Sequence, residues 1–551
     1  MDAHAAATED TGRARWLGLV ALTVGVAMII VDATIVNVAI PSIIRDLDVG
    51  ITQAEWANSI YSLVFASLLI SVGRLGDVVG RRRVFLAGLL VFVAASLLTA
   101  RAESGTVLLA GRLLQGVGGA LILPSTLSIV NATFRGRERA IAFGIWGSVI
   151  GGMAALGPLV GGWFTTNLSW RWAFYVNVPI AAAAFAGALA FVGESRDPGA
   201  RRGLDLAGVL LSTVGFAGLV FGLIEGQTYG WWTAEQPFLH VTLGRVSVIP
   251  LAFAVGVAAL AAFAVVERRR GRRGQPVLID LALFRIPSFR NGSIAVMIVG
   301  LGELGLVFVI PLFLQSVLGL SAFRTGVILV ALAGGAFVAG GLAATLTNRL
   351  GAPRVVQLGL ALEVVGIVAV GLTFAPGREA WQFCPQLFLY GLGVGLATAQ
   401  LTSVILADVP PAQSGEASGI QSTSRQVGAA LGIAILGTAL SVGLANGTRE
   451  RLDGVQGLSP AAAARVADAV ERTGGAVLPE LRRSPVLEAT VAPVAEAFAA
   501  SARRAAFIAA GFVVLGLVAA LWLGSGRPAE TEAMPPADDR ARRSTEAPAG
   551  T

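Results

Sequence analysis

GRLGDVVGRRR (Gly73–Arg83) separates two apolar runs, 54–73 and 84–101, each close to the length of about 20 residues that crosses a bilayer as a helix. Gly80 allows a tight turn, and three consecutive arginines, beginning with Arg81, follow it. Asp77 lies at the end of the first run, where it can pair with an arginine or with a helix N-terminus. The segment predicts a short turn between membrane helices, with a carboxylate available to hold one conformation.

Similar apolar runs recur along the whole chain. The chain is 55% hydrophobic and 14% charged, against about 25% charged residues in soluble proteins. Because such a number of long apolar runs cannot fit inside a soluble core, we expect an all-α polytopic membrane protein. The fourteen predicted membrane helices lie near 16–41, 54–73, 84–101, 106–130, 139–165, 173–193, 204–225, 243–266, 291–316, 323–347, 354–375, 381–406, 419–444 and 503–525.

Arginines are concentrated in alternate short connections between these runs. Such an asymmetry orients a membrane protein with its positive loops inside. We therefore expect a multi-pass protein of the bacterial cytoplasmic membrane with both termini in the cytoplasm, and the net charge of +7 requires no nucleic-acid partner. The arginine clusters lie at 13–15, 81–83, 135–139, 196–202 and 268–273.

An internal repeat predicts the domain organisation. The segment 344–354 resembles a diverged copy of Gly73–Arg83, and the segment 414–417 resembles the segment 137–140. Two six-helix bundles with two inserted helices would produce this pattern, and such transporters bind substrate between their halves. The predicted parts are a cytoplasmic tail at 1–15, a bundle at 16–200, inserted helices at 201–270, a bundle at 271–525 with an outer loop at 447–502, and a disordered cytoplasmic tail at 526–551.

Two charged residues of opposite sign lie deep in the first and fourth runs. From the rise of a helix, Asp32 lies about 14 Å and Arg112 about 9 Å from the outer ends of their runs. Because a charge in hydrocarbon is costly, each should face a cavity or a partner. We expect the two to approach each other, although an arginine bonded only to backbone carbonyls is the alternative.

Several motifs resemble those of the major facilitator superfamily, and in particular its fourteen-helix drug:proton antiporters of the EmrB/QacA type. The resemblance rests on Gly73–Arg83, on Asp32 to Pro41, on Arg112-Leu-Leu-Gln-Gly116, on the glycine-rich fifth run, on Trp170 to Pro179 and on Arg425 to Gly428. It implies a major facilitator fold and a part for Arg112 in proton coupling. It also implies that Gly157, Pro158 and Gly161 mark an exporter, although close helix packing alone would explain these glycines.

Further polar residues within the apolar runs are candidates for binding substrate or protons. Glu303 lies in the ninth run, which corresponds to the first run in the repeat, so we expect it to face the cavity with Asn37 and Gln115. Glu363 lies in the eleventh run, where we leave a structural and a lipid-facing role open.

The remaining motifs exclude several classes of function. The sequence has no GxxxxGK segment, so nothing indicates ATP as a direct energy source. One cysteine, Cys384, and two histidines predict neither a metal site nor another cofactor. We predict a proton-coupled antiporter, not an enzyme, that exports small hydrophobic or cationic drugs or antibiotics across the lipid bilayer by alternating access. The alternatives are a proton-linked uptake carrier for a small metabolite and a membrane enzyme acting on lipid.

Overall fold

The computed structural model describes residues 2–49, 51–196, 205–235, 245–275, 277–453, 455, 458–473, 477–484 and 487–522. These residues form helices, and the one extended pairing among them is an isolated bridge between Thr233 and Val246. The predicted all-α class is therefore confirmed. The tail expected to be disordered, 526–551, lies outside the described residues.

The described residues of the first half of the chain form seven helices. The first begins at residue 2, so most of the tail predicted at 1–15 is helical. A short helix and the one that follows it together match the sixth predicted run. The helices are α1 (Asp2–Leu47), α2 (Ile51–Val79), α3 (Arg81–Ala100), α4 (Gly105–Thr133), α5 (Gly136–Asn167), α6 (Trp172–Tyr175) and α7 (Asn177–Phe191).

Two helices separate this half from the second half. They are α8 (Leu206–Tyr229) and α9 (Val248–Arg272), which pack on each other, and α8 also contacts α2 and α14. The second half contains η1 (Leu281–Arg285), α10 (Pro287–Ser316), α11 (Ala322–Leu350), α12 (Ala352–Thr373), η2 (Ala380–Phe383), α13 (Cys384–Ile405), η3 (Pro411–Gln413), α14 (Ser414–Leu452), α15 (Pro460–Thr473), α16 (Leu478–Leu481) and α17 (Glu488–Leu521).

In the part of the chain that the structure describes, fourteen long helices match the fourteen predicted runs. Within the described residues, thirteen helical segments are long and apolar enough to cross a membrane. The other predicted run, 139–165, is α5, a helix of 32 residues that includes positions whose side chains are not described. The length and hydropathy of the runs were therefore sufficient to locate the helices.

The two halves meet chiefly along two pairs of helices, α2 with α14 and α5 with α11, and α13 also packs on α5 and α14 on α4. Glycine makes both contacts close, because a Cβ atom on Gly73 would lie 2.3 Å from the carbonyl oxygen of Gly415. On the second pair, a Cβ on Gly326 would lie 2.9 Å from the backbone nitrogen of Leu159. The helices touch backbone to backbone, as small residues allow in lipid.

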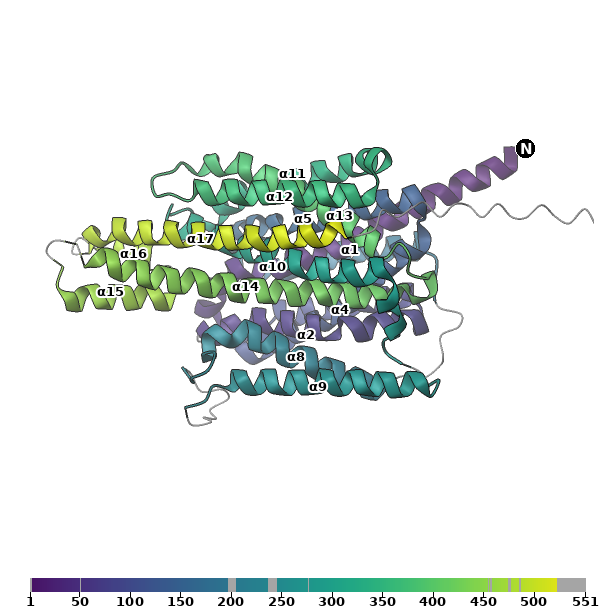
Figure 1. Cartoon of the computed structure of the whole chain (residues 1–551), viewed down its shortest axis with the longest axis horizontal. Helices are drawn as coiled ribbons and strands as arrows, with labels where there is room; N and C mark the ends of the chain where they lie inside the picture. Colours follow the sequence, from purple (N-terminus) through teal and green to yellow (C-terminus); the bar gives the residue numbers. More distant parts are fainter. Residues whose placement is uncertain are drawn as a thin grey trace, which may run out of the picture.

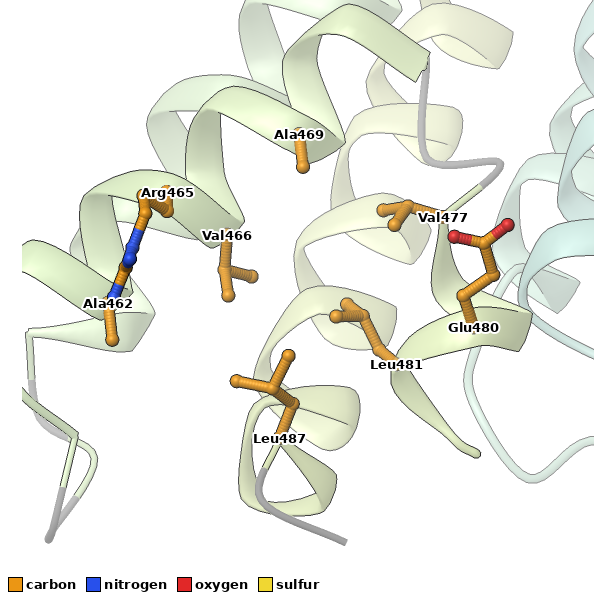
Figure 2. Close-up of a pocket in the computed structure, with 8 residues that line it drawn as sticks. All are labelled: Ala462, Arg465, Val466, Ala469, Val477, Glu480, Leu481 and Leu487. Atoms are coloured by element: carbon orange, nitrogen blue, oxygen red, sulfur yellow. The ribbon is translucent and has the colours of Figure 1, made fainter. Parts of the chain in front are cut away.

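A helical lobe projects from the end of the bundle opposite the N-terminus (Figure 1). The segment 447–502, predicted as an outer loop with helical stretches, contains the end of α14 at Leu452, the helices α15 and α16, and the start of α17 at Glu488. Alanine, the strongest helix former, is frequent in 488–502, which explains why the helix extends so far. The connection, with α15 and α16, encloses a groove of about 320 Å³ lined mainly by apolar side chains such as Val466, Leu481 and Leu487 (Figure 2).

Candidate functional site

Asp32 lies at the centre of a polar cluster inside the first half. Its carboxylate is fully buried in α1 and accepts a hydrogen bond from Arg112 Nη1 of α4 at 2.6 Å. Gln115, one helical turn further along α4, donates to the other carboxylate oxygen at 2.8 Å. The three residues predicted from the first and fourth runs are therefore brought together, and the charge of Asp32 is compensated within hydrocarbon.

Arg112 is held from several sides at once. Its Nε atom donates to the carbonyl oxygen of Ala57 at 2.9 Å, and its Nη1 atom donates a second hydrogen bond to Gln115 Oε1 at 2.9 Å. The guanidinium carbon lies 4.4 Å from the centre of the Tyr61 ring, a favourable cation–π arrangement. Arg112 therefore pairs with Asp32 and also donates to a backbone carbonyl, so it is not an arginine bonded to backbone carbonyls alone.

Two members of this cluster, Asn177 and Ser96, were not identified from the sequence. Asn177, at the start of α7, donates to Asp32 Oδ1 at 2.7 Å and to Ser96 Oγ of α3 at 3.1 Å. Ser96 also accepts from Gln115 at 2.9 Å. Three helices of the first half, α3, α4 and α7, therefore supply groups around the carboxylate of α1. Asn37, the other predicted polar residue of α1, has a side chain outside the described set.

A second charged cluster lies in the other half. Glu303 of α10 accepts from Arg425 Nη2 of α14 at 3.0 and 3.3 Å, with the glutamate 5% exposed. The hydroxyl of Tyr390, from α13, donates to the backbone carbonyl of Glu303 at 2.8 Å. Sequence analysis singled out Glu303 as a binding residue but did not predict its pairing with Arg425.

Glu363 of α12 lies inside the protein. Its side chain is 0% exposed, so the lipid-facing alternative is wrong. Neither carboxyl oxygen has a hydrogen-bond partner among the described residues. The neighbouring helix explains the burial, because a Cβ on Gly393 of α13 would lie 2.4 Å from the backbone nitrogen of Glu363.

The carboxylate of Asp77 joins the two halves at the end of the bundle that carries the 80–83 turn. It accepts from Arg81 Nη2 at 2.7 Å and from the backbone amides of Gly415 and Glu416 at 3.0 and 2.9 Å. These amides belong to the first turn of α14, where a helix favours negative charge. Arg81 also donates to the carbonyl oxygen of Pro411 at 2.7 Å. We call Asp77, Arg81, Gly415 and Glu416 the Asp77 latch.

Gly80 is required at its position for conformational and steric reasons. Its φ of 124° is one that residues with a Cβ rarely adopt. A Cβ there would also lie 2.8 Å from the carboxylate of Glu194. Glu194 accepts from the backbone amides of Arg82 and Arg83 at 3.1 and 3.3 Å, so the turn is fixed by the segment that follows α7.

The glycines of α5 bring it against α1. A Cβ on Gly157 would lie 1.8 Å from Thr34 Oγ1, and one on Gly161 would lie 2.6 Å from Ile35 Cγ1. Pro158, predicted with them, has a side chain outside the described set. The two described glycines face α1 two to three residues from Asp32, so α5 packs beside the buried carboxylate.

The sequence model of the Major Facilitator Superfamily matches residues 22–433. The chain is 34% identical to the probable actinorhodin transporter of Streptomyces coelicolor over 77% of this chain and 72% of that protein. It is 35% identical to the puromycin resistance protein pur8 of Streptomyces alboniger, over 79% of this chain and 84% of that one. It is also 32% identical to the multidrug efflux pump LfrA of Mycolicibacterium smegmatis, over 85% and 88% of the two chains.

A solved structure shares the fold. The human organic anion transporter MFSD10 (TETRAN) superposes with a TM-score of 0.55, covering 92% of this chain and 98% of that chain. The sequence identity is 14%, so this likeness concerns the arrangement of helices alone.

Proposed function

Because this chain belongs to the major facilitator superfamily, we propose that it exports small hydrophobic or cationic compounds in exchange for protons. The family and its relatives indicate a transporter rather than an enzyme. The relatives' names include an antibiotic transporter, an antibiotic resistance protein and a multidrug efflux pump, which supports drug efflux as the transport activity.

The observation that carries proton coupling is the fully buried contact between Asp32 and Arg112. An arginine stays charged at any physiological pH, whereas a carboxylate can take up a proton. A proton on Asp32 would remove the attraction and leave Arg112 as an uncompensated buried charge, which is costly. Protonation would therefore favour a conformation in which Arg112 has other partners, and this change would couple proton flow to movement of the helices.

Glu303 is our candidate for binding the transported compound, with Gln115 and Asn37 on the other half. A cationic compound near Glu303 would compete with Arg425 for its carboxylate, and a hydrophobic body would contact the surrounding apolar helices. The substrate would then lie between the halves, consistent with binding near the midplane in transporters built from repeats.

Opening and closing would occur by rocking of the bundles 16–200 and 271–525 about this site. The Asp77 latch would hold one end closed, and the glycine contacts of Gly157 and Gly161 would keep α5 sealed against α1. By the arginine distribution, the latched end is the cytoplasmic side of a bacterial cytoplasmic membrane, and both termini lie there. This conformation would then be the one that is closed to the cytoplasm.

Transport into inverted membrane vesicles tests the proposal. Vesicles with the protein should accumulate a fluorescent cationic dye when their interior is made acidic, and an uncoupler should stop accumulation. Asp32→Asn and Glu303→Gln should each abolish the response to the pH gradient, while Glu103→Gln, at an exposed connection, should retain it. Gradient-driven dye movement out of these vesicles would instead indicate uptake by the cell. An unchanged response of the variant that combines Asp32→Asn with Glu303→Gln would reject the assigned residues.

A further inference from the structure

Glu363 is a buried acid to which the proposed mechanism assigns no role. It is 0% exposed, and neither of its carboxyl oxygens has a hydrogen-bond partner among the described residues. A charged carboxylate without a partner in such a place is strongly unfavourable, whereas the neutral acid is tolerated. Glu363 therefore fits a group that carries a proton in this conformation.

α13 contacts both the helix that carries Glu363 and the pair of Glu303 and Arg425. Tyr390 and Gly393 are one turn apart on α13 and pack against Gly366 and Glu363 of α12, respectively. The Tyr390 hydroxyl at the same time donates to the backbone of Glu303 at 2.8 Å. Glu303 and Arg425 are also the charged groups whose electrostatic effect reaches Glu363.

The other helices near Glu363 present no further charge to it. α11 carries charged residues only at 324 and 349, near its ends. The charged residues of α17 lie at 488–504, and Arg503 donates to the carbonyl oxygen of Phe374, about three turns from Glu363. The titratable and charged groups that face Glu363 are therefore Glu303, Tyr390 and Arg425.

We propose that Glu363 is a second proton-binding site, separate from Asp32. Glu363 releases its proton when a cationic substrate replaces Arg425 as the ion-pair partner of Glu303. Before this step, Glu303 is an anion, Arg425 a cation and Glu363 a neutral acid, so the cluster has no net charge. The substrate cation then pairs with Glu303, and Arg425 turns to Glu363. The O–H bond of Glu363 breaks, its proton leaves to water, and the new carboxylate pairs with Arg425.

The net charge of the cluster with its substrate is again zero after the step. This exchange avoids leaving an unpaired charge in a buried site, which would cost far more than the exchange of one ion pair for another. The cluster thereby selects a monovalent lipophilic cation and releases one proton for each cation bound. The inference rests on the proposed export function and adds to it a residue and a substrate class.

Infrared spectroscopy of the whole protein tests the protonation state without any transport. The spectrum should contain a carboxylic acid C=O band that is lost in Glu363→Gln and retained in Glu379→Gln, an exposed position of the same half. Glutamine is neutral and has nearly the shape of the protonated acid, so this variant should fold. Absence of such a band from the difference spectrum between wild type and Glu363→Gln would overturn the proposal.

Proton release on binding tests the exchange itself. Tetraphenylphosphonium added to the purified protein in weakly buffered detergent should release one proton fewer from Glu363→Gln than from wild type, while Glu379→Gln releases the wild-type amount. Equal release from wild type and Glu363→Gln would overturn the inference.

Transport of the same cation separates this inference from the proposed function. Wild-type vesicles should respond to a pH gradient, and Glu363→Gln should respond more weakly. If wild type responds and Glu363→Gln responds equally, the second proton site is rejected and the export function stands. If transport by the wild-type protein does not depend on the pH gradient, both the proton-coupled export function and the second proton site at Glu363 are rejected.

Discussion

The carboxylate of Asp77 accepts a hydrogen bond at 2.9 Å from the backbone amide of Glu416, across the contact between the two halves of the protein. The two residues are 339 positions apart in the chain. A side chain at the end of α2 thus caps the first turn of α14. This contact exists only while the halves are together at this end, so its strength contributes to the balance between conformations.

Asp77→Asn should shift that balance toward a conformation open at the latched end. Hydrogen bonds to a charged acceptor are worth about 1.5–3 kcal/mol each, and 1.4 kcal/mol is a factor of about ten in an equilibrium constant. We therefore expect the ratio of closed to open protein to fall at least about tenfold. Spin labels at Arg137→Cys and Arg349→Cys, with the native Cys384 replaced by serine, would report the distance between the halves.

A matched change away from the latch supplies the control. Glu103→Gln removes one exposed carboxylate from a connection between α3 and α4 and should leave the distance distribution unchanged. The same distribution for Asp77→Asn and wild type would show that the latch does not contribute to closure.

Gly157→Ala should separate α5 from α1. The new Cβ would lie 1.8 Å from Thr34 Oγ1 and 3.0 Å from the carbonyl oxygen of Val31, which cannot move without its helix. Overpacking of this kind costs about 1–3 kcal/mol. The midpoint of thermal unfolding in detergent and the rate of dye export should both fall.

Gly341→Ala on α11 is the control for this substitution. Nothing lies within 4 Å of a Cβ at this position, and alanine favours a helix over glycine by about 1 kcal/mol. Its unfolding midpoint should therefore equal or exceed that of wild type. If the two variants unfold at the same temperature, the close contact of α5 with α1 is not needed for stability.

The contact of Asp32 with Arg112 followed from the sequence because two opposite charges at similar depth in hydrocarbon have few other partners. Asn177 was harder to identify, since a neutral amide near a helix start has many ordinary roles. It lies within the motif from Trp170 to Pro179, and that motif was the only available signal.

The face of α12 that carries Glu363 could not be assigned from hydrophobic periodicity, because a membrane helix is apolar all round. One signal was nevertheless present. Gly359 and Gly366 lie four residues before and three after Glu363, so they share its face. A Cβ on Gly359 would lie 2.6 Å from the backbone nitrogen of Ala397, and a glycine-lined face of this kind packs against protein and not lipid.

Asn177→Ala should destabilise the cluster around Asp32. The change removes a donor at 2.7 Å from a buried carboxylate, and such a hydrogen bond is worth about 1.5–3 kcal/mol. Asn167→Ala removes an exposed amide that donates, among the described residues, to the carbonyl oxygen of Trp163, and it should change stability by less than about 0.5 kcal/mol. Denaturant titration of both variants would measure the difference, and equal values would remove Asn177 from the cluster's energetics.

A double-mutant cycle on Asp32 and Arg112 measures how strongly the buried pair depends on both members. Asp32→Asn leaves a buried arginine without its carboxylate, and Arg112→Gln leaves a buried carboxylate without its cation, each at a cost of about 3–5 kcal/mol. The double variant has neither charge, so it should be more stable than either single variant. None of the three should respond to a pH gradient, because proton binding at Asp32 is absent or no longer linked to Arg112.

The same cycle on Asp46 and Arg171, whose side chains are 48% and 30% exposed, should give a coupling of no more than about 1 kcal/mol. Thermal unfolding followed by tryptophan fluorescence would yield both couplings, and equal values for the buried and exposed pairs would contradict a special energetic role for the buried one.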